Sequence, residues 1–296
     1  MTTVARGSRR DVAVTAPMRV ILVVAAGLVF LAGLQLTVFP LRTAEWFAWT
    51  IDVPMTAVFL GASYWSSAVL EVAGSRAAVW GHARLSVWTV FVFTTLTLVV
   101  TLVHLDKFHL GSGEPLSARL VTWGWLAIYA GVPVAMLVIA WRQTRPGRPG
   151  PGPAPPRVPL ATGLRALLVL LAVVLVGTGV VLLVAPATAE VLWAWPLTDL
   201  TARAVGAWLV GLGWAAGHAR LVDDVVGVRP LGWTGSTFVV LQAVALARYG
   251  DALAWSSPAA VGYLAGLALV GVVSVSILVA DARLRAAAGT ASASPR

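Results

Sequence analysis

Apolar runs separated by short polar segments recur eight times along this chain. A helix of about 20 apolar residues is long enough to cross the hydrocarbon core of a bilayer, which is roughly 30 Å thick. Backbone amides inside that core find no water, so each run must satisfy them within a helix. The sequence therefore predicts an all-α membrane protein with about eight transmembrane helices. The predicted spans are residues 20–39, 53–72, 85–103, 120–141, 164–184, 200–219, 233–247 and 259–280.

Composition excludes the main soluble classes. Hydrophobic residues make up 59% of the chain and charged residues 11%, compared with roughly 25% charged residues in a typical soluble domain. The net charge of +9 does not indicate a nucleic-acid-binding protein, because the basic residues lie between the apolar runs and form no single patch. The absence of cysteine excludes disulfides and thiolate chemistry.

An internal repeat organises the chain. Residues 188–220 have a degenerate copy at residues 43–76, and both copies begin with Thr-Ala-Glu. The matched positions include Glu45 with Glu190, Asp52 with Asp199, Gly61 with Gly206, Trp88 with Trp233, and Asp106 with Asp251. We therefore expect two parallel four-helix repeats, each with a short interfacial helix after its first span.

The expected boundaries follow from composition. Residues 1–18 form a disordered cytoplasmic tail, 19–141 the first membrane repeat, and 142–160 a Pro/Gly-rich cytoplasmic linker. Residues 161–281 form the second repeat and 282–296 a cytoplasmic tail.

The distribution of Lys and Arg predicts the orientation. With the N-terminus inside, only Arg42, Lys107, Arg119, Arg203 and Arg248 of the 21 Lys and Arg residues fall on the outer side. Basic residues concentrate on the cytoplasmic side of membrane proteins. We expect a multi-pass protein of the bacterial plasma membrane with both termini cytoplasmic.

Candidate site residues gather on the predicted outer face. The two short helices should be anchored at headgroup depth by four tryptophans, Trp46, Trp49, Trp193 and Trp195. Asp52 and Asp199 have the position of N-caps. Arg203 lies about one turn inside its span, with Asp199 and Glu190 as the natural partners for its charge, although a structural ion pair is the commoner outcome. The candidate ligand-binding residues are Glu190, Arg203, Asp199, Glu45, Asp52, Trp195 and Trp49, and the secondary outer-face candidates are Asp106, Asp251, His104 and Arg248.

Other polar groups have simpler interpretations. His104 and His109 lack a third strong ligand, so we expect no metal site, and no cofactor motif is present. Glu71 and Arg76 are expected to form a surface ion pair at the cytoplasmic boundary. Paired glycines at 213 and 217, and at 262 and 266, are typical of close helix packing.

The segment TAEVLWAWPLTDLTARAVGAW, together with HLDKF at residues 104–108, resembles a group of uncharacterised multi-pass integral membrane proteins of actinobacteria. The resemblance implies the membrane class and an internally duplicated four-helix unit. It implies no activity.

Three functional classes remain open. The first is a non-catalytic component that binds lipid, a membrane protein partner or a second copy of itself. The second is a small-molecule transporter with a site between the two repeats. The third is an enzyme acting on a lipid-linked substrate at the outer leaflet. Transport predicts a polar cavity between the halves, whereas a solid apolar junction favours binding.

Overall fold

A computed structural model describes residues 12–145 and 157–293 of the chain. Within these two ranges the protein is all-helical and holds no β-strand, only two isolated bridges, Ala13 to Val79 and Trp49 to Phe108. The prediction of an all-α protein is confirmed.

Eight long helices make up most of the described part of the chain. They are α1 (Ala16–Val38), α3 (Pro54–Arg76), α4 (Trp80–Val103), α5 (Leu116–Gln143), α6 (Thr162–Val184), α8 (Asp199–Val222), α9 (Val225–Tyr249) and α10 (Pro258–Ala293). Each contains one of the predicted apolar runs, apart from a residue at an end. The run 233–247, the shortest of the eight, becomes the full-length α9 because residues 225–232 continue the helix through Pro230.

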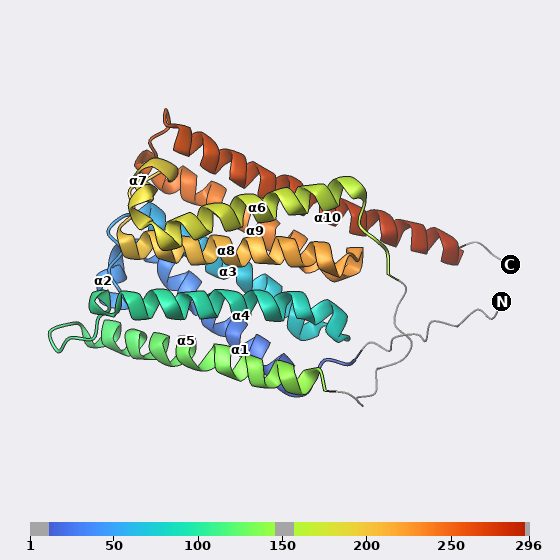
Figure 1. Cartoon of the computed structure of the whole chain (residues 1–296), viewed down its shortest axis with the longest axis horizontal. Coiled ribbons are helices and arrows are strands. Elements are labelled where there is room, and N and C mark those ends of the chain that lie inside the picture. The colour runs from blue at the N-terminus through green and yellow to red at the C-terminus, as the bar shows by residue number, and fades with distance from the viewer. Residues whose placement is uncertain (1–11, 146–156, 294–296) are drawn as a thin grey trace.

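Short elements connect these helices at one end of the bundle. They are the 3₁₀ turns η1 (Pro40–Arg42), η2 (Leu105–Lys107), η3 (Pro186–Thr188) and η4 (Gly250–Ala252), and the single-turn helices α2 (Thr43–Trp46) and α7 (Ala189–Leu192). Each half therefore reads long helix, 3₁₀ turn, short helix, two long helices, 3₁₀ turn, long helix. Figure 1 places α2 and α7 at the same end of the bundle.

Six of the long helices are long and apolar enough to cross a membrane: α1, α4, α5, α6, α9 and α10. This is the character of a multi-pass membrane protein. The two helices outside this set, α3 and α8, carry more polar residues and are also the most buried along their length. A helix that neighbouring helices shield from lipid needs no continuous apolar surface, which is the physical reason for the difference.

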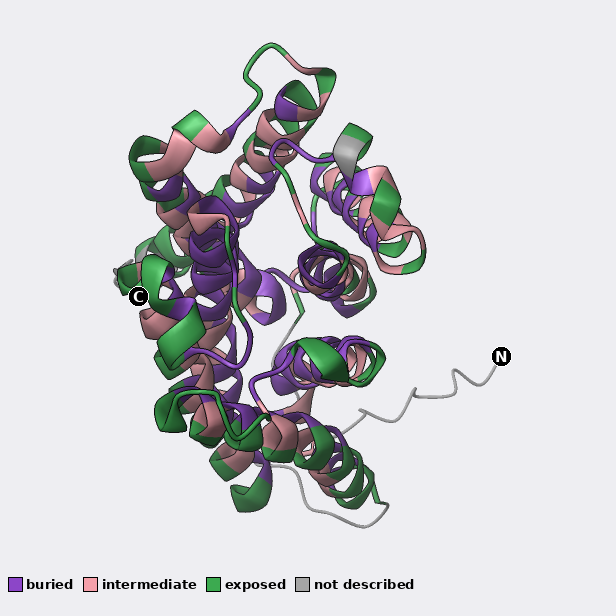
Figure 2. Cartoon of the chain, turned by 90° about the vertical axis from the view of Figure 1, so that its left-hand side faces the viewer, coloured by how far each residue is buried: buried purple, intermediate pink, exposed green. Residues whose placement is uncertain are grey.

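The pairing of helices is the same in the two halves. Within them, α1 packs against α3 and α6 against α8, while α4 contacts α5 and α9 contacts α10. Between them, α3 packs against α9, and α8 packs against α4. Viewed along the bundle axis, buried backbone gathers on the inner helices and exposed backbone lies at the periphery (Figure 2).

Glycines set the closest helix approach. A Cβ on Gly206 of α8 would lie 2.7 Å from the carbonyl oxygen of Gly179 on α6, so neither position has room for a side chain. Gly213 continues this contact about two turns further along α8, where a Cβ would lie 2.7 Å from a methyl group of Val176. The packing role expected of Gly213 is therefore confirmed. It is wrong for Gly262 and Gly266, which face open space instead of another helix.

The observed helix ends differ from several predicted boundaries. The first tail, 1–18, ends inside α1, and most of its residues lie outside the described ranges, as does the linker segment 146–156. α5 continues two residues beyond its predicted end at 141, and the amide of Thr144 still donates to the carbonyl of Ala140 (3.1 Å). Likewise α10 runs through most of the predicted tail, 282–296, whose last three residues are outside the described part.

Candidate functional site

Each half closes with an elbow at the end of the bundle that carries α2 and α7. The elbow is the segment that follows the short helix and folds back over the bundle. In the first half the amide of His109 donates to the carbonyl of Ala48 (3.0 Å), and in the second the amide of Ala254 donates to the carbonyl of Ala194 (3.1 Å). These backbone bonds turn the next residue of each elbow, Trp49 or Trp195, into the protein.

The elbow tryptophans are core residues. Both Trp49 and Trp195 are 3% exposed, and Trp193 is 8% exposed. Trp195 Nε1 donates to Thr56 Oγ1 (2.9 Å) on α3, which ties the second elbow to the first half. The prediction that these three side chains anchor the short helices among lipid headgroups is wrong, because the side chains are buried inside the protein. Trp46 alone among the four predicted anchors is exposed.

His109 explains why the first elbow keeps its shape. Its Nδ1 lies 2.9 Å from the carbonyl oxygen of Phe47 and its Nε2 lies 3.0 Å from Thr50 Oγ1. A neutral imidazole satisfies both contacts by donating from Nδ1 and accepting at Nε2. His109 therefore has a structural role in the elbow.

Arg203 is the centre of the one polar cluster that the structure builds from the predicted site residues. Its Nη1 lies 2.8 Å from His104 Nε2, at the end of α4, and 4.0 Å from an oxygen of Asp199. Its Nε donates to the carbonyl of Leu183 (3.0 Å), at the end of α6. The cluster thus joins both halves at the end of the bundle that carries α2 and α7. The ion pair expected between Arg203 and Asp199 is present but long (4.0 Å), because His104 takes the closer position beside Nη1 of Arg203.

The guanidinium of Arg203 fixes the state of His104. Arginine can only donate, so His104 Nε2 accepts and its proton sits on Nδ1. Burial, and then the charge of Arg203, lower the pKa of His104 below its usual value. The imidazole is neutral at neutral pH and competes with any external anion for Arg203.

The remaining predicted residues do not join this cluster. Glu45 forms an exposed ion pair with Arg42 (2.9 Å), and Asp106 forms one with Lys107 (3.3 Å). Asp52 and Asp251 are exposed. Arg248 donates to the carbonyl of Thr37 (3.3 Å) and lies over the ring of Tyr249. Glu190 lies on α7, and its side chain falls outside the described part of the structure.

The N-caps of α3 and α8 each lie one residue away from the predicted positions, Asp52 and Asp199. Val53 occupies the cap position of α3 and makes no side-chain cap, so Asp52 lies one residue too early. Thr198 caps α8 in a reciprocal arrangement with Thr201, which leaves Asp199 as the first helical residue. A carboxylate there still interacts favourably with the helix dipole.

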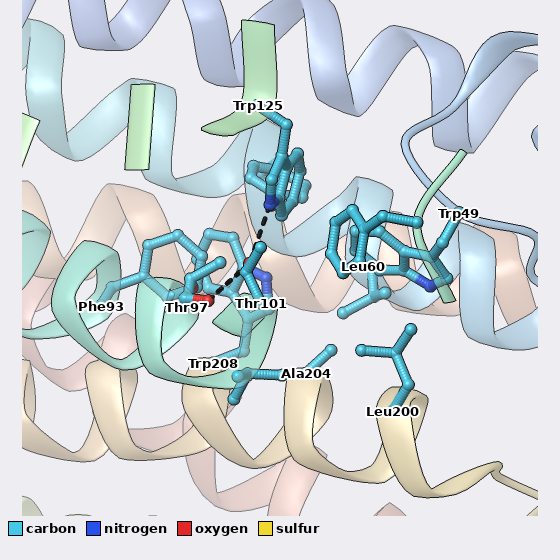
Figure 3. Close-up of a pocket in the computed structure, with 12 residues that line it drawn as sticks. Trp49, Leu60, Phe93, Thr97, Thr101, Trp125, Leu200, Ala204 and Trp208 are labelled. Atoms are coloured by element: carbon cyan, nitrogen blue, oxygen red, sulfur yellow. Dashed lines mark hydrogen bonds between the residues drawn. The ribbon is translucent and has the colours of Figure 1, made fainter. Parts of the chain in front are cut away.

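The junction between the halves is filled by aromatic side chains (Figure 3). The ring centroids of Phe93 and Trp208 lie 3.8 Å apart, and those of Tyr64 and Trp208 lie 4.9 Å apart. Trp125 Nε1 donates to Thr101 Oγ1 (3.0 Å). The cavity among these residues measures about 10 Å³, room for about one water molecule.

A larger cavity opens on the second half, which we call the lateral groove. It measures about 480 Å³, and its walls come from α6, α7, α8, α9 and α10 with Phe59 of α3 at its base. Gly262 and Gly266 line it, which is why they contact no other helix. Its walls are apolar except at Thr178, Trp193 and Tyr263. Trp193 Nε1 is buried there and has no hydrogen-bond partner among the described residues.

Glu71 is the functional candidate that the sequence reasoning missed. It is 2% exposed on α3 and forms no ion pair with Arg76 within the described ranges, so the expected surface pair is wrong. The signal was available in the spacing. Five residues turn a helix by about 500°, which places Arg76 on another face than Glu71.

Comparison with known proteins gives no further assignment. No protein family matches the sequence, and neither the curated proteins nor the solved structures contain a significant match.

Proposed function

We propose that this protein is a non-catalytic component of the bacterial plasma membrane that binds a lipid in the lateral groove. The observation that carries the proposal is the groove itself: an apolar cavity of about 480 Å³ on the second half with one unpaired N–H at its outer end. The occupant we assign is a hydrocarbon chain of a membrane lipid.

The dimensions of the groove fit one membrane leaflet. Its lining along α10 runs from Pro258 to Val270, and 12 residues of helix rise by about 18 Å. Half of a hydrocarbon core that is roughly 30 Å thick measures about 15 Å. A lipid chain can therefore occupy the groove from the α7 end to the middle of the membrane.

The polar groups of the groove suit the ester region of a lipid. Trp193 follows α7 at the outer end, where a glycerolipid places its ester carbonyls. An indole N–H buried without a partner costs free energy, and an acceptor from the ligand would remove that cost. We propose that Trp193 Nε1 donates to a carbonyl or phosphate oxygen of the bound lipid.

The placement of the protein in the membrane is part of this proposal. We propose that α3 and α8 also cross the bilayer, which gives eight spans in two parallel repeats, as the shared element order and helix pairing support. The Arg-rich ends of the helices support cytoplasmic termini. The likeness to the actinobacterial group stays a proposal of the same kind, as does a membrane protein partner or a homo-oligomer.

Native mass spectrometry of the full chain tests lipid binding. Gly266→Leu adds a side chain into the groove, and Gly124→Leu adds the same side chain to the exposed surface of α5 as a control. We expect the wild type and Gly124→Leu to retain one lipid, and Gly266→Leu to retain about tenfold less, a difference of about 1.4 kcal/mol. Equal lipid retention by both variants would contradict the proposal.

Transport is the second candidate function, and one observation favours it. Glu71 is an ionisable group buried among the helices, as proton- or ion-coupled carriers require. The aromatic filling of the junction between the halves favours binding instead. Outer-leaflet catalysis would need Arg203 free for a substrate, whereas His104 and Leu183 engage it.

A further inference from the structure

Glu71 is buried without a counter-ion. Its carboxyl group lies 17 residues into the 23-residue helix α3, and its Oε2 has no hydrogen-bond partner among the described residues. Ser67, one turn earlier on the same helix, interacts with the carboxyl group. One oxygen is therefore left to face the space beside it.

That space is a separate cavity of about 60 Å³ in the first half, lined by α1, α3, α4 and α5. Its lining includes Thr94 and Tyr129, which lie near the middle of α4 and α5, so the cavity is at the depth of the membrane centre. A cavity needs about 10–15 Å³ for each water molecule, so this one can hold several. Its polar lining consists of Glu71, Thr94 and the Tyr64–Tyr129 pair, whose hydroxyls lie 2.8 Å apart.

No basic side chain lines this cavity. The nearby cations belong to the cytoplasmic helix ends: Arg76 is exposed, and Arg19 of α1 donates to the carbonyls of Ser75 (2.7 Å) and Ala77 (2.8 Å). The titratable groups that face Glu71 across the cavity are the two tyrosines, which are neutral. A carboxylate buried among apolar helices without a cation is very costly, so the group is held as the neutral acid.

Packing does not explain the residue. The alignment that matches Gly61 with Gly206 places Glu71 opposite Ala216 of α8, which is also fully buried. The second half therefore builds the same helix pair without a carboxyl group. An intramembrane acid retained at such cost is expected to have a functional role.

We propose that Glu71 is a proton-binding site inside the first half of the bundle, and that water in the adjoining cavity exchanges its proton. The ligand of this site is a proton together with a small water cluster. The site is independent of the lateral groove, which lies in the other half.

Infrared spectroscopy of the full chain in lipid discs gives the direct readout. We expect a C=O stretching band of a protonated carboxylic acid at neutral pH, which Glu71→Gln lacks and which shifts in D₂O because water reaches the proton. A carboxylate band in its place would overturn the proposal. An acid band that does not shift in D₂O would overturn the exchange.

Carbodiimide labelling of the wild type gives an answer that does not depend on the folding of Glu71→Gln. The hydrophobic reagent dicyclohexylcarbodiimide adds the O–H of a protonated acid across an N=C bond, and the O-acylisourea rearranges to a stable N-acylurea with no leaving group. We expect this adduct on the peptide that contains Glu71, with a yield that falls as the pH rises. An unmodified peptide, or protection by sodium ions at constant pH, would contradict proton binding.

Discussion

Arg203 Nη1 and His104 Nε2 lie 2.8 Å apart and link α8 of the second half to the end of α4 in the first. The sequence predicts that Arg203 pairs with Asp199 or Glu190 of its own half. The neutral imidazole, which accepts the hydrogen bond, is instead its closest partner, and the contact joins the two halves at the end of the bundle that carries α2 and α7.

We expect Arg203→Gln to lower the free energy of unfolding by about 1–3 kcal/mol, because it breaks a partly buried hydrogen bond to His104 and leaves the carbonyl of Leu183 unpaired. Unfolding in mixed micelles with increasing denaturing detergent measures this. The matched control is Arg248→Gln on the same face, whose exposed side chain should change stability by less than about 0.5 kcal/mol. Equal losses for the two variants would rule out a special role for the Arg203–His104 contact.

The stability should also depend on pH through His104. Burial and the Arg203 charge lower its pKa in the folded protein, so near the ordinary histidine pKa, about 6.5, the unfolded chain binds more protons. Stability is therefore expected to fall as the pH drops through that value and to level off below the lowered, folded-state pKa. His104→Gln should reduce this step. A step of the same size in the variant would assign it to another group.

The close approach of α6 and α8 gives a prediction with a control on the same helix. Gly179→Ala places a methyl group against the carbonyl of Gly206 and should cost about 1–3 kcal/mol of stability through overpacking. Gly177→Ala on the same helix meets open space and should be neutral or stabilising by up to about 1 kcal/mol. Thermal unfolding in detergent compares the two. Matching changes would show that α6 and α8 are further apart than described.

Asp223 provides a test at the other end of the bundle. Burial raises its pKa, but hydrogen bonds from Arg165 and from the amide of Leu160 outweigh this and lower the pKa overall. Its contribution is then complete above the ordinary aspartate pKa, about 3.9, and is lost as the pH falls through the lower folded-state value. Asp223→Asn keeps the left-handed backbone, which asparagine tolerates, and should cost about 1.5–3 kcal/mol at neutral pH. The difference from the wild type should shrink below about pH 4, and a constant difference would contradict the assignment.

The fold was largely predictable because membrane helices are specified by run length, and the ends of α6 and α1 fall within a few residues of the apolar runs. The site was less predictable because inward and outward tryptophans share one sequence pattern. Only the backbone bridge at Ala48 or Ala194 decides which way the next residue turns. A local sequence pattern does not specify contacts between residues that lie far apart in the chain.

Glycine spacing shows the same limit. Gly213 and Gly262 both begin a Gly-x₃-Gly motif, yet the first meets Val176 and the second faces the lateral groove. The motif specifies a helix surface without side chains. Whether another helix or a ligand occupies that surface depends on the tertiary arrangement.

The central claim is that two four-helix units cross the membrane in the same direction. The chain has no cysteine, so single cysteines can be introduced one at a time. Ser112 precedes α5 and Ser256 precedes α10, at corresponding positions of the two halves, whereas Ala78 lies between α3 and α4 at the opposite end.

Labelling with a membrane-impermeant maleimide in intact cells tests this claim most directly. We predict that Ser112→Cys and Ser256→Cys both react from outside, and that Ala78→Cys reacts only after the membrane is permeabilised. Reaction of Ser112→Cys and Ser256→Cys from opposite sides would contradict parallel repeats.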